Sequence, residues 1–266
     1  MKFNRPLFWN NINLISILLY PLSLITLLIN IIKKVSHKKS FKIKSICVGN
    51  LYVGGTGKTS LSIKINSILK KKYKTVFIKK KYSDQIDEQN ILKFCGNLIC
   101  KQRRDNALKI ATNKKYEVAI LDDGLQNKSI NYDIAIACFN SSDGIGNGFL
   151  IPSGPLRESI YEIKNYDAIV LNGEKSNKKF SKYLKKINKN IKVFEGKYIP
   201  TNLALFNLKK NFLFFCGLGN PLEFERTLKK HKFKIKEKFI FPDHYNFTNS
   251  DIFSIKKLAK QKKLNI

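Results

Sequence analysis

Residues 45–60 read SICVGNLYVGGTGKTS, and this stretch decides the fold. A short apolar run over residues 45–48 leads into a glycine-rich turn, after which Lys58 and Thr59 open a segment of helical pattern. A strand, a glycine-rich turn and a Lys-Thr pair at a helix N-terminus are the parts of a phosphate-binding loop. The candidate nucleotide-binding residues are therefore Gly54, Gly55, Thr56, Gly57, Lys58, Thr59 and Ser60.

Each part of this loop suits a chemical role. Glycines let backbone N–H groups approach phosphate oxygens, and the helix N-terminus adds positive potential. Lys58 is expected to reach the β- and γ-phosphates as a catalytic cation, and the Thr59 hydroxyl is expected to bind Mg²⁺. Tyr52 stands where the consensus loop has glycine, so the loop is a variant. A glycine-rich turn that binds no nucleotide is the alternative interpretation.

The second half of a nucleotide site is expected at residues 118–124, which read VAILDDG. Four apolar residues predict a buried strand that delivers a carboxylate to its C-terminal end, where ligands of open α/β sheets bind. Asp122 and Asp123 are the candidate metal ligands. If the strand continues, the two side chains point in opposite directions, so one is expected near Mg²⁺ and the other near a second substrate; the pattern does not decide which.

Short apolar runs alternate with Lys-rich helical stretches beyond residue 44, which predicts the α/β class with parallel strands joined by helices. We expect a membrane-associated helix over residues 1–34, a phosphate-loop lobe over 35–170 and a smaller α/β lobe over 171–266. The second boundary is placed where an apolar strand pattern over residues 166–172 gives way to a Lys-rich segment.

Residues 6–32 carry no charge and are rich in Leu and Ile. Their few polar residues recur at spacings of three and four, which predicts a helix with one narrow polar stripe. The stripe and Pro21 favour a helix that lies in the membrane interface over one that spans the bilayer, although the length permits both. The third interpretation is a buried core helix. The Lys-rich cluster over residues 33–44 indicates that the rest of the chain stays on the cytoplasmic side.

The formal net charge is +31, and only five of the 50 basic residues are Arg. Such a charge favours anionic partners, but Arg is the usual donor to base edges and paired phosphate contacts, so its scarcity argues against nucleic acid. The five cysteines are scattered among apolar residues, which indicates reduced structural thiols and no cysteine-bound metal.

Five motifs, the phosphate loop and the Asp122–Asp123 segment among them, lie in order along nearly the whole chain, together with the apolar N-terminal segment. They are GN-x-x-VGGTGKT (residues 49–59), LDDG-x-Q (121–126), GNG-x-L-x-P-x-GPLRE (146–158), FCGLGNP (215–221) and FPDH (241–244). On these motifs the chain closely resembles the tetraacyldisaccharide 4′-kinases. The resemblance implies ATP and Mg²⁺, an acylated glucosamine disaccharide 1-phosphate as acceptor, and a place at the cytoplasmic face of the bacterial inner membrane, in lipid A biosynthesis.

The resemblance also implies site residues. The family's carboxylate–histidine pair matches Asp87 and His244, which are expected to orient the acceptor hydroxyl and accept its proton. Arg157 and Glu158 match the GPLRE motif, and Arg157 is expected to bind a substrate phosphate while Glu158 holds it in place. A salt bridge that only fixes a loop is the alternative for Arg157.

Two segments depart from the family pattern. Residues 79–83 read KKKYS where the family has Ser-Arg-Gly-Tyr-Gly, which alters the loop before Asp87. The family continues beyond residue 266 with a further strand, so the smaller lobe is expected to be cut short at its C-terminus. The competing functional hypothesis is a membrane-recruited switch or transport ATPase, but Val53 occupies that class's signature Lys position and the GPLRE motif has no role in it.

Overall fold

A computed structural model describes residues 6–34, 38–82, 85–200, 202–243 and 245–266. The chain divides into two compact units, a larger one that ends at Gly196 and a smaller one that begins at Lys197.

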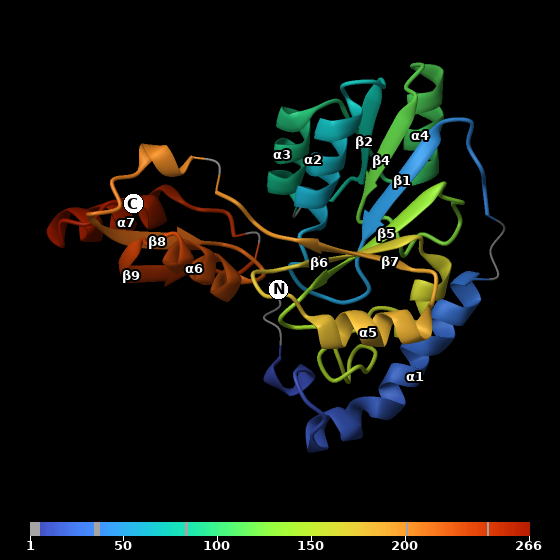
Figure 1. The fold of residues 1–266 in the computed structure, drawn as a ribbon, viewed down its shortest axis with the longest axis horizontal. Coiled ribbons are helices and arrows are strands. Elements are labelled where there is room, and N and C mark those ends of the chain that lie inside the picture. Colours follow the sequence, from blue (N-terminus) through green and yellow to red (C-terminus); the bar gives the residue numbers. More distant parts are fainter. Residues whose placement is uncertain (1–5, 35–37, 83–84, 201, 244) are drawn as a thin grey trace. The chain divides into compact units, whose positions relative to one another are not determined.

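The larger unit is built on a seven-stranded parallel sheet in the order β3-β2-β4-β1-β5-β6-β7 (Figure 1). Its strands are β1 (Lys44–Gly49), β2 (Thr75–Lys80), β3 (Leu98–Lys101), β4 (Val118–Asp122), β5 (Ile134–Asn140), β6 (Ala168–Asn172) and β7 (Lys192–Gly196). The helices that join them are α2 (Lys58–Leu69), α3 (Ile86–Cys95), α4 (Arg104–Asn113) and α5 (Lys178–Ile187), with a 3₁₀ helix, η2, over Ile160–Asn165. The predicted α/β class, with a phosphate-loop sheet, is confirmed.

Helices cover both faces of this sheet, which explains why its central strands are apolar throughout. Alternate residues of β4 join opposite cores: Ala119 and Leu121 pack with Leu108 of α4, whereas Ile120 packs with Leu92 of α3. Since β1 pairs with β4 in parallel register, with Val48 opposite Asp122, both strands end at the same edge of the sheet. That edge carries the phosphate loop and the candidate carboxylates.

The larger unit extends beyond the boundary expected near residue 170. β7 pairs with β6 over residues 192–196 and completes the sheet. The Lys-rich segment that suggested a new lobe contains α5, which buries Phe180 and Leu184 in the core of the larger unit. The division therefore falls after Gly196.

The smaller unit contains a 3₁₀ helix, η3 (Leu203–Leu205), then β8 (Asn211–Cys216), α6 (Pro221–Lys230), β9 (Lys234–Ile240) and α7 (Asn249–Gln261). β8 and β9 pair in parallel, and Leu213 packs against Ile255 and Ala259 of α7. The last residues follow the other edge of β8, since the N–H of Leu213 donates to the carbonyl oxygen of Asn265 at 2.8 Å. Asn265 thus forms an isolated bridge with Phe212 of β8.

The N-terminal segment forms a 3₁₀ helix, η1 (Leu7–Trp9), and the long helix α1 (Leu14–Lys34), which includes Pro21. The polar stripe of α1 faces the protein: Ser23 Oγ donates to the carbonyl oxygen of Leu150 at 2.8 Å, and Thr26 Oγ1 to that of Ile151 at 2.7 Å. Most of the large apolar side chains of α1 point outward, and Leu18 is 70% exposed. Hence α1 buries its polar face and exposes its apolar one, the reverse of a surface helix in a water-soluble protein.

Candidate active site

The phosphate loop connects β1 to α2 and has the backbone that its glycines predict. Gly54 has φ 135° and Gly57 has φ 79°, a left-handed region that residues with a Cβ rarely adopt. Tyr52, which replaces a consensus glycine, is 1% exposed and packs on Phe139, so it belongs to the core and lies outside the phosphate cradle. The Asn50 side-chain amide donates to the carbonyl oxygen of Tyr52 at 2.7 Å and shapes the turn from inside.

The N-terminus of α2 is open to an anion. Its N-cap is Gly57, without a side-chain cap, and its first turn carries no acidic residue. The first N–H groups of such a helix need partners, and a phosphate provides them. The Thr56 hydroxyl is buried without a hydrogen-bond partner among the described residues, which is a second unsatisfied polar group at the same turn. These features fit the phosphates of a nucleoside triphosphate.

Asp122 ends β4 directly beside this helix. Its carboxylate is fully buried, and it accepts hydrogen bonds from Thr59 Oγ1 and Ser62 Oγ, both at 3.2 Å. A third donor is Lys79 Nζ, 2.7 Å from Asp122 Oδ2. A hydroxyl and a carboxylate in contact are hard oxygen ligands of the kind Mg²⁺ takes together with substrate phosphates, so the donor set fits that ion.

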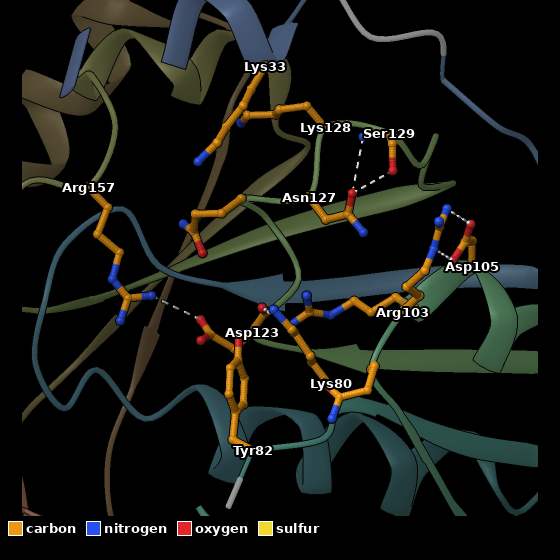
Figure 2. A pocket seen from close by; sticks show the side chains of 13 residues that line it. Lys33, Lys80, Tyr82, Arg103, Asp105, Asp123, Asn127, Lys128, Ser129 and Arg157 are labelled. Carbon is orange, nitrogen blue, oxygen red and sulfur yellow. Dashed lines mark hydrogen bonds and ion pairs between the residues drawn. The ribbon is translucent and has the colours of Figure 1, made fainter. Parts of the chain in front are cut away.

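Asp123 points away from this cluster, but not by continuation of the strand, because β4 ends at Asp122. It has φ 54°, and its side chain faces Arg157, with Nη1 to Oδ1 at 3.5 Å (Figure 2). Burial alone would raise the pKa of Asp123, but four nearby positive charges together outweigh that effect and hold the pKa below its usual range. These charges are Lys58, Arg157, Lys79 and Arg104. The structure thus separates the two acids: Asp122 contacts the phosphate-loop threonine, and Asp123 faces a cavity.

That cavity has a volume of about 610 Å³. Figure 2 shows Lys33, Lys80, Arg103, Lys128 and Arg157 around it, and Arg104 is also in its lining. Six cations thus face two lining carboxylates, Asp105 and Asp123. Arg103 and Asp105 pair with each other at 2.7 Å. The cavity suits an anionic ligand.

Arg104 adds a specific donor to this cavity. Its Nη2 donates to the carbonyl oxygen of Asp123 at 2.5 Å, while its Nε is buried and without a hydrogen-bond partner among the described residues. A buried guanidinium nitrogen without an acceptor is costly, and an oxygen of a bound anion would satisfy it.

The loop that carries Arg157 is bound on both sides. The N–H of Arg157 donates to the carbonyl oxygen of Leu51 at 2.7 Å, and that of Val53 donates to Pro155 at 2.9 Å, so this loop lies along the phosphate loop. On its other side, the Asn30 side-chain amide of α1 donates to the carbonyl oxygen of Arg157 at 2.9 Å. The loop therefore links the N-terminal helix to the phosphate loop.

Glu158 has a different environment from the one expected. Its carboxylate is buried and binds Lys128 at 2.9 Å and the hydroxyl of Tyr166 at 3.2 Å, whereas Arg157 pairs with Asp123. The expectation that Glu158 holds Arg157 in place is corrected accordingly: Glu158 holds Lys128, which lines the cavity. The two neighbouring side chains thus have different partners, Asp123 for Arg157 and Lys128 for Glu158.

Of the catalytic pair expected from the resemblance, the structure describes one member. Asp87 is exposed in the first turn of α3 and is not part of the cavity lining. His244 lies outside the residues that the structure describes. The roles of both residues stay predictions.

The sequence alone does not identify several residues as parts of this site. Four of them line the cavity, namely Lys33, Arg103, Arg104 and Lys128, and Lys79 contacts Asp122. For Arg103 and Arg104 a signal exists. The chain has only five Arg among 50 basic residues, and three of them, Arg103, Arg104 and Arg157, line one cavity. In a Lys-rich chain the retained Arg residues indicate sites where a planar, bidentate donor is needed.

Known proteins match nearly the whole chain in sequence. The family model described as tetraacyldisaccharide-1-P 4′-kinase (LpxK) matches residues 15–94 and 87–266. The tetraacyldisaccharide 4′-kinase of Pelagibacter ubique is 45% identical over 269 residues, which are all of this chain and 85% of that protein. The enzyme of the same name from Rickettsia canadensis is 34% identical, over 98% of this chain and 84% of that protein.

Among solved structures, LpxK of Aquifex aeolicus, described as an apo form in complex with ATP, matches with a TM-score of 0.66 at 24% identity. The match covers 88% of this chain and 85% of that one, and it supports the fold. The family model and the relatives extend over the phosphate loop, the Asp122–Asp123 strand and the Arg157 loop alike. With these three segments in one structural unit and matched in sequence, the chain belongs to the tetraacyldisaccharide-1-P 4′-kinase family.

Proposed function

We propose that this protein transfers the γ-phosphoryl group of ATP to the 4′-hydroxyl of a tetraacylated glucosamine disaccharide 1-phosphate, a step of lipid A biosynthesis. Family membership supports the reaction class, and the names of the relatives supply the substrate. The observation that carries the proposal is the proximity of two anion sites, the open phosphate loop and the basic cavity, on either side of Asp122 and Asp123.

The phosphate loop binds the triphosphate in this proposal. The backbone N–H groups of the loop and of the uncapped N-terminus of α2 would donate hydrogen bonds to the phosphate oxygens. The binding residues are Gly54, Gly55, Thr56, Gly57, Lys58, Thr59 and Ser60. Lys58 is the first residue of α2 and lies close enough to lower the pKa of Asp123. Its ammonium is therefore well placed to stabilise negative charge on the phosphates during transfer.

Mg²⁺ would be held by Thr59 and Asp122, and when bound it would neutralise charge on the phosphoryl oxygens. Asp122 fits this role because its carboxylate contacts the Thr59 hydroxyl. We assign Asp123 to the acceptor side, because it faces Arg157 across the cavity.

The cavity would bind the phosphorylated sugar. Arg157 and the unsatisfied Nε of Arg104 provide donors for the acceptor's phosphate or hydroxyl oxygens. Glu158 acts through Lys128, which it holds at the cavity wall. Asp87 and His244 stay the proposed pair that orients the 4′-hydroxyl and accepts its proton.

The exposed apolar face of α1 would bind the surface of the membrane that holds the acylated acceptor. The apolar stretch within residues 14–33 has a mean hydropathy of 2.3, and only 11% of it is buried in the protein. Because the opposite face of α1 is hydrogen-bonded to the loop at residues 150–157, we propose that the helix lies in the interface at the cytoplasmic face of the inner membrane. Lys33 near its C-terminal end lines the cavity, which would place the acceptor's headgroup beside the lipid surface.

Purified protein with Mg-ATP, assayed with and without the acylated disaccharide 1-phosphate, tests the proposal. Phosphoryl transfer that depends on the acceptor supports a kinase. ATP hydrolysis at the same rate with and without acceptor would instead support the switch or transport ATPase, and the absence of both activities would contradict either enzyme.

A further inference from the structure

Lys79 is a fully buried cation next to the proposed metal site. It is the penultimate residue of β2, and its side chain is 1% exposed. β2 pairs with β4 such that Ile78 lies opposite Leu121, so the following residues, Lys79 and Asp122, are neighbours at the end of the sheet where the phosphate loop lies. Lysine is almost never fully buried unless it is paired.

Two carboxylates accept from this ammonium. Lys79 Nζ lies 2.7 Å from Asp122 Oδ2 and also binds Glu88 Oε2 of α3. Asp122 Oδ2 is in addition the oxygen that accepts from Thr59, at 3.2 Å. The same carboxylate oxygen therefore contacts both the phosphate-loop hydroxyl and a permanent protein cation.

The ammonium is buried between two carboxylates at hydrogen-bond distance, the condition under which a protein interior holds a charged lysine. Without Lys79, the side-chain donors to the buried Asp122 carboxylate within the described part of the chain would be the hydroxyls of Thr59 and Ser62. A buried charge that loses its partner is strongly destabilising.

We propose that Lys79 is a positioning residue that shares Asp122 with the divalent metal: it holds the carboxylate in place before metal binds and thereby weakens the affinity of the site for metal. The inference rests on the proposed nucleotide and metal site. A cation within hydrogen-bond distance of a metal ligand repels the metal ion. It also partly neutralises the negative charge of the ligand. Both effects are strong where water is excluded.

Glu88 sets how much of the ammonium's charge Asp122 receives. It lies in the first turn of α3, adjacent to Asp87 in the sequence. When the Glu88 carboxylate is present, Lys79 divides its hydrogen bonds between two acids. Removal of the Glu88 charge leaves the ammonium to Asp122 alone. Loss of the Lys79 charge and loss of the Glu88 charge should therefore change metal affinity in opposite directions. A general loss of packing would not produce opposite changes.

The test measures Mn²⁺ binding to the full-length protein with a non-hydrolysable ATP analogue, by the paramagnetic resonance signal of free Mn²⁺. Lys79→Met keeps the length of the side chain and removes its charge, and we expect Mn²⁺ to bind about tenfold more tightly than in the wild type. Glu88→Gln is the matched variant and should bind Mn²⁺ more weakly than the wild type. Lys79→Met should also have a lower melting temperature without metal and a larger gain on addition of Mn²⁺ and nucleotide.

If Lys79→Met does not fold, the double variant Lys79→Met/Glu88→Gln removes one cation and one carboxylate and keeps the buried charge balanced; it too should bind Mn²⁺ more tightly. Unchanged or weaker Mn²⁺ binding in the folded Lys79 variant, with normal binding in the wild type, overturns this inference alone. Failure of the wild type to bind Mn²⁺ with nucleotide overturns the proposed function, and the role of Lys79 with it.

Discussion

The backbone N–H of Arg157 donates to the carbonyl oxygen of Leu51 at 2.7 Å, so the residue that faces the cavity is fixed directly to the phosphate loop. The two loops come from residues about a hundred positions apart in the chain, and the sheet brings them together. A change in the position of one loop is therefore transmitted to the other through the backbone.

Arg157→Lys should raise KM for the acceptor by about tenfold or more and leave KM for ATP nearly unchanged. The reason is that Lys keeps the charge but loses the planar pair of donors that grips a phosphate or carboxylate. The hydrogen bond to Leu51 is made by the backbone and survives the substitution. Initial rates with each substrate varied in turn check this, and an equal rise in both KM values would show that Arg157 acts on the loop as a whole.

Asp122→Asn and Asp123→Asn should differ in kind. Asp122→Asn should raise the Mg²⁺ concentration needed for half-maximal rate, because the carboxylate beside Thr59 is lost. Asp123→Asn should lower kcat with little change in the Mg²⁺ requirement. Mg²⁺ titrations of both variants measure this, and a shifted requirement in Asp123→Asn alone would reverse the assignment.

The pKa of Asp123 adds a pH prediction. Because its folded pKa lies below the usual value, the carboxylate is ionised throughout the neutral range, and its stabilising effect is lost only as the pH falls through that lowered pKa. The pH profile of kcat/KM in Asp123→Asn should therefore keep every limb that the wild type shows between about pH 6 and 9. Loss of a limb in that range would mean that Asp123 titrates near neutrality.

The outward face of α1 can be tested by charge. Leu18→Glu/Leu28→Glu should release the protein from anionic vesicles in high salt, because both side chains are exposed apolar contacts and salt screens the Lys residues. Ile68→Glu/Phe94→Glu is the matched control, since these residues are also exposed and apolar but lie on α2 and α3. Sedimentation should separate the two double variants, and equal release would remove α1 as the specific anchor.

Features that depend on residues close together in the chain could be predicted from the sequence, whereas features that depend on contacts between distant residues could not. The phosphate loop and the Asp122–Asp123 strand are local patterns, and both occur where the residues predict. The polar stripe of α1 was also visible, but its partners are carbonyl oxygens near residue 150, and no local pattern shows that the stripe would face the protein. Likewise Lys79 in a run of three lysines looks like a solvated residue, and only the pairing of β2 with β4 buries it.

Asp87→Asn and His244→Ala test the acid–base pair that the family resemblance implies. If the two act together, each should slow phosphoryl transfer by a factor of roughly 10² to 10⁴ with little change in nucleotide affinity. The double variant should be scarcely slower than the slower single variant, because groups that act as a unit are not additive. Losses that multiply would indicate independent roles, and a loss below about tenfold for Asp87→Asn would reduce Asp87 to a residue of the α3 surface.

In the proposed reaction, the phosphate loop at Lys58 delivers the γ-phosphoryl group to a lipid acceptor. The most direct measurement follows the label from γ-labelled ATP into the acylated disaccharide 1-phosphate, with wild type and Lys58→Ala compared at equal folded concentration. We predict labelled lipid from the wild type and a kcat/KM lower by about 10² or more in the variant, because the cation that stabilises the transferring phosphoryl group is lost. Label that appears only as inorganic phosphate, or near-equal labelled lipid from Lys58→Ala, would contradict the account.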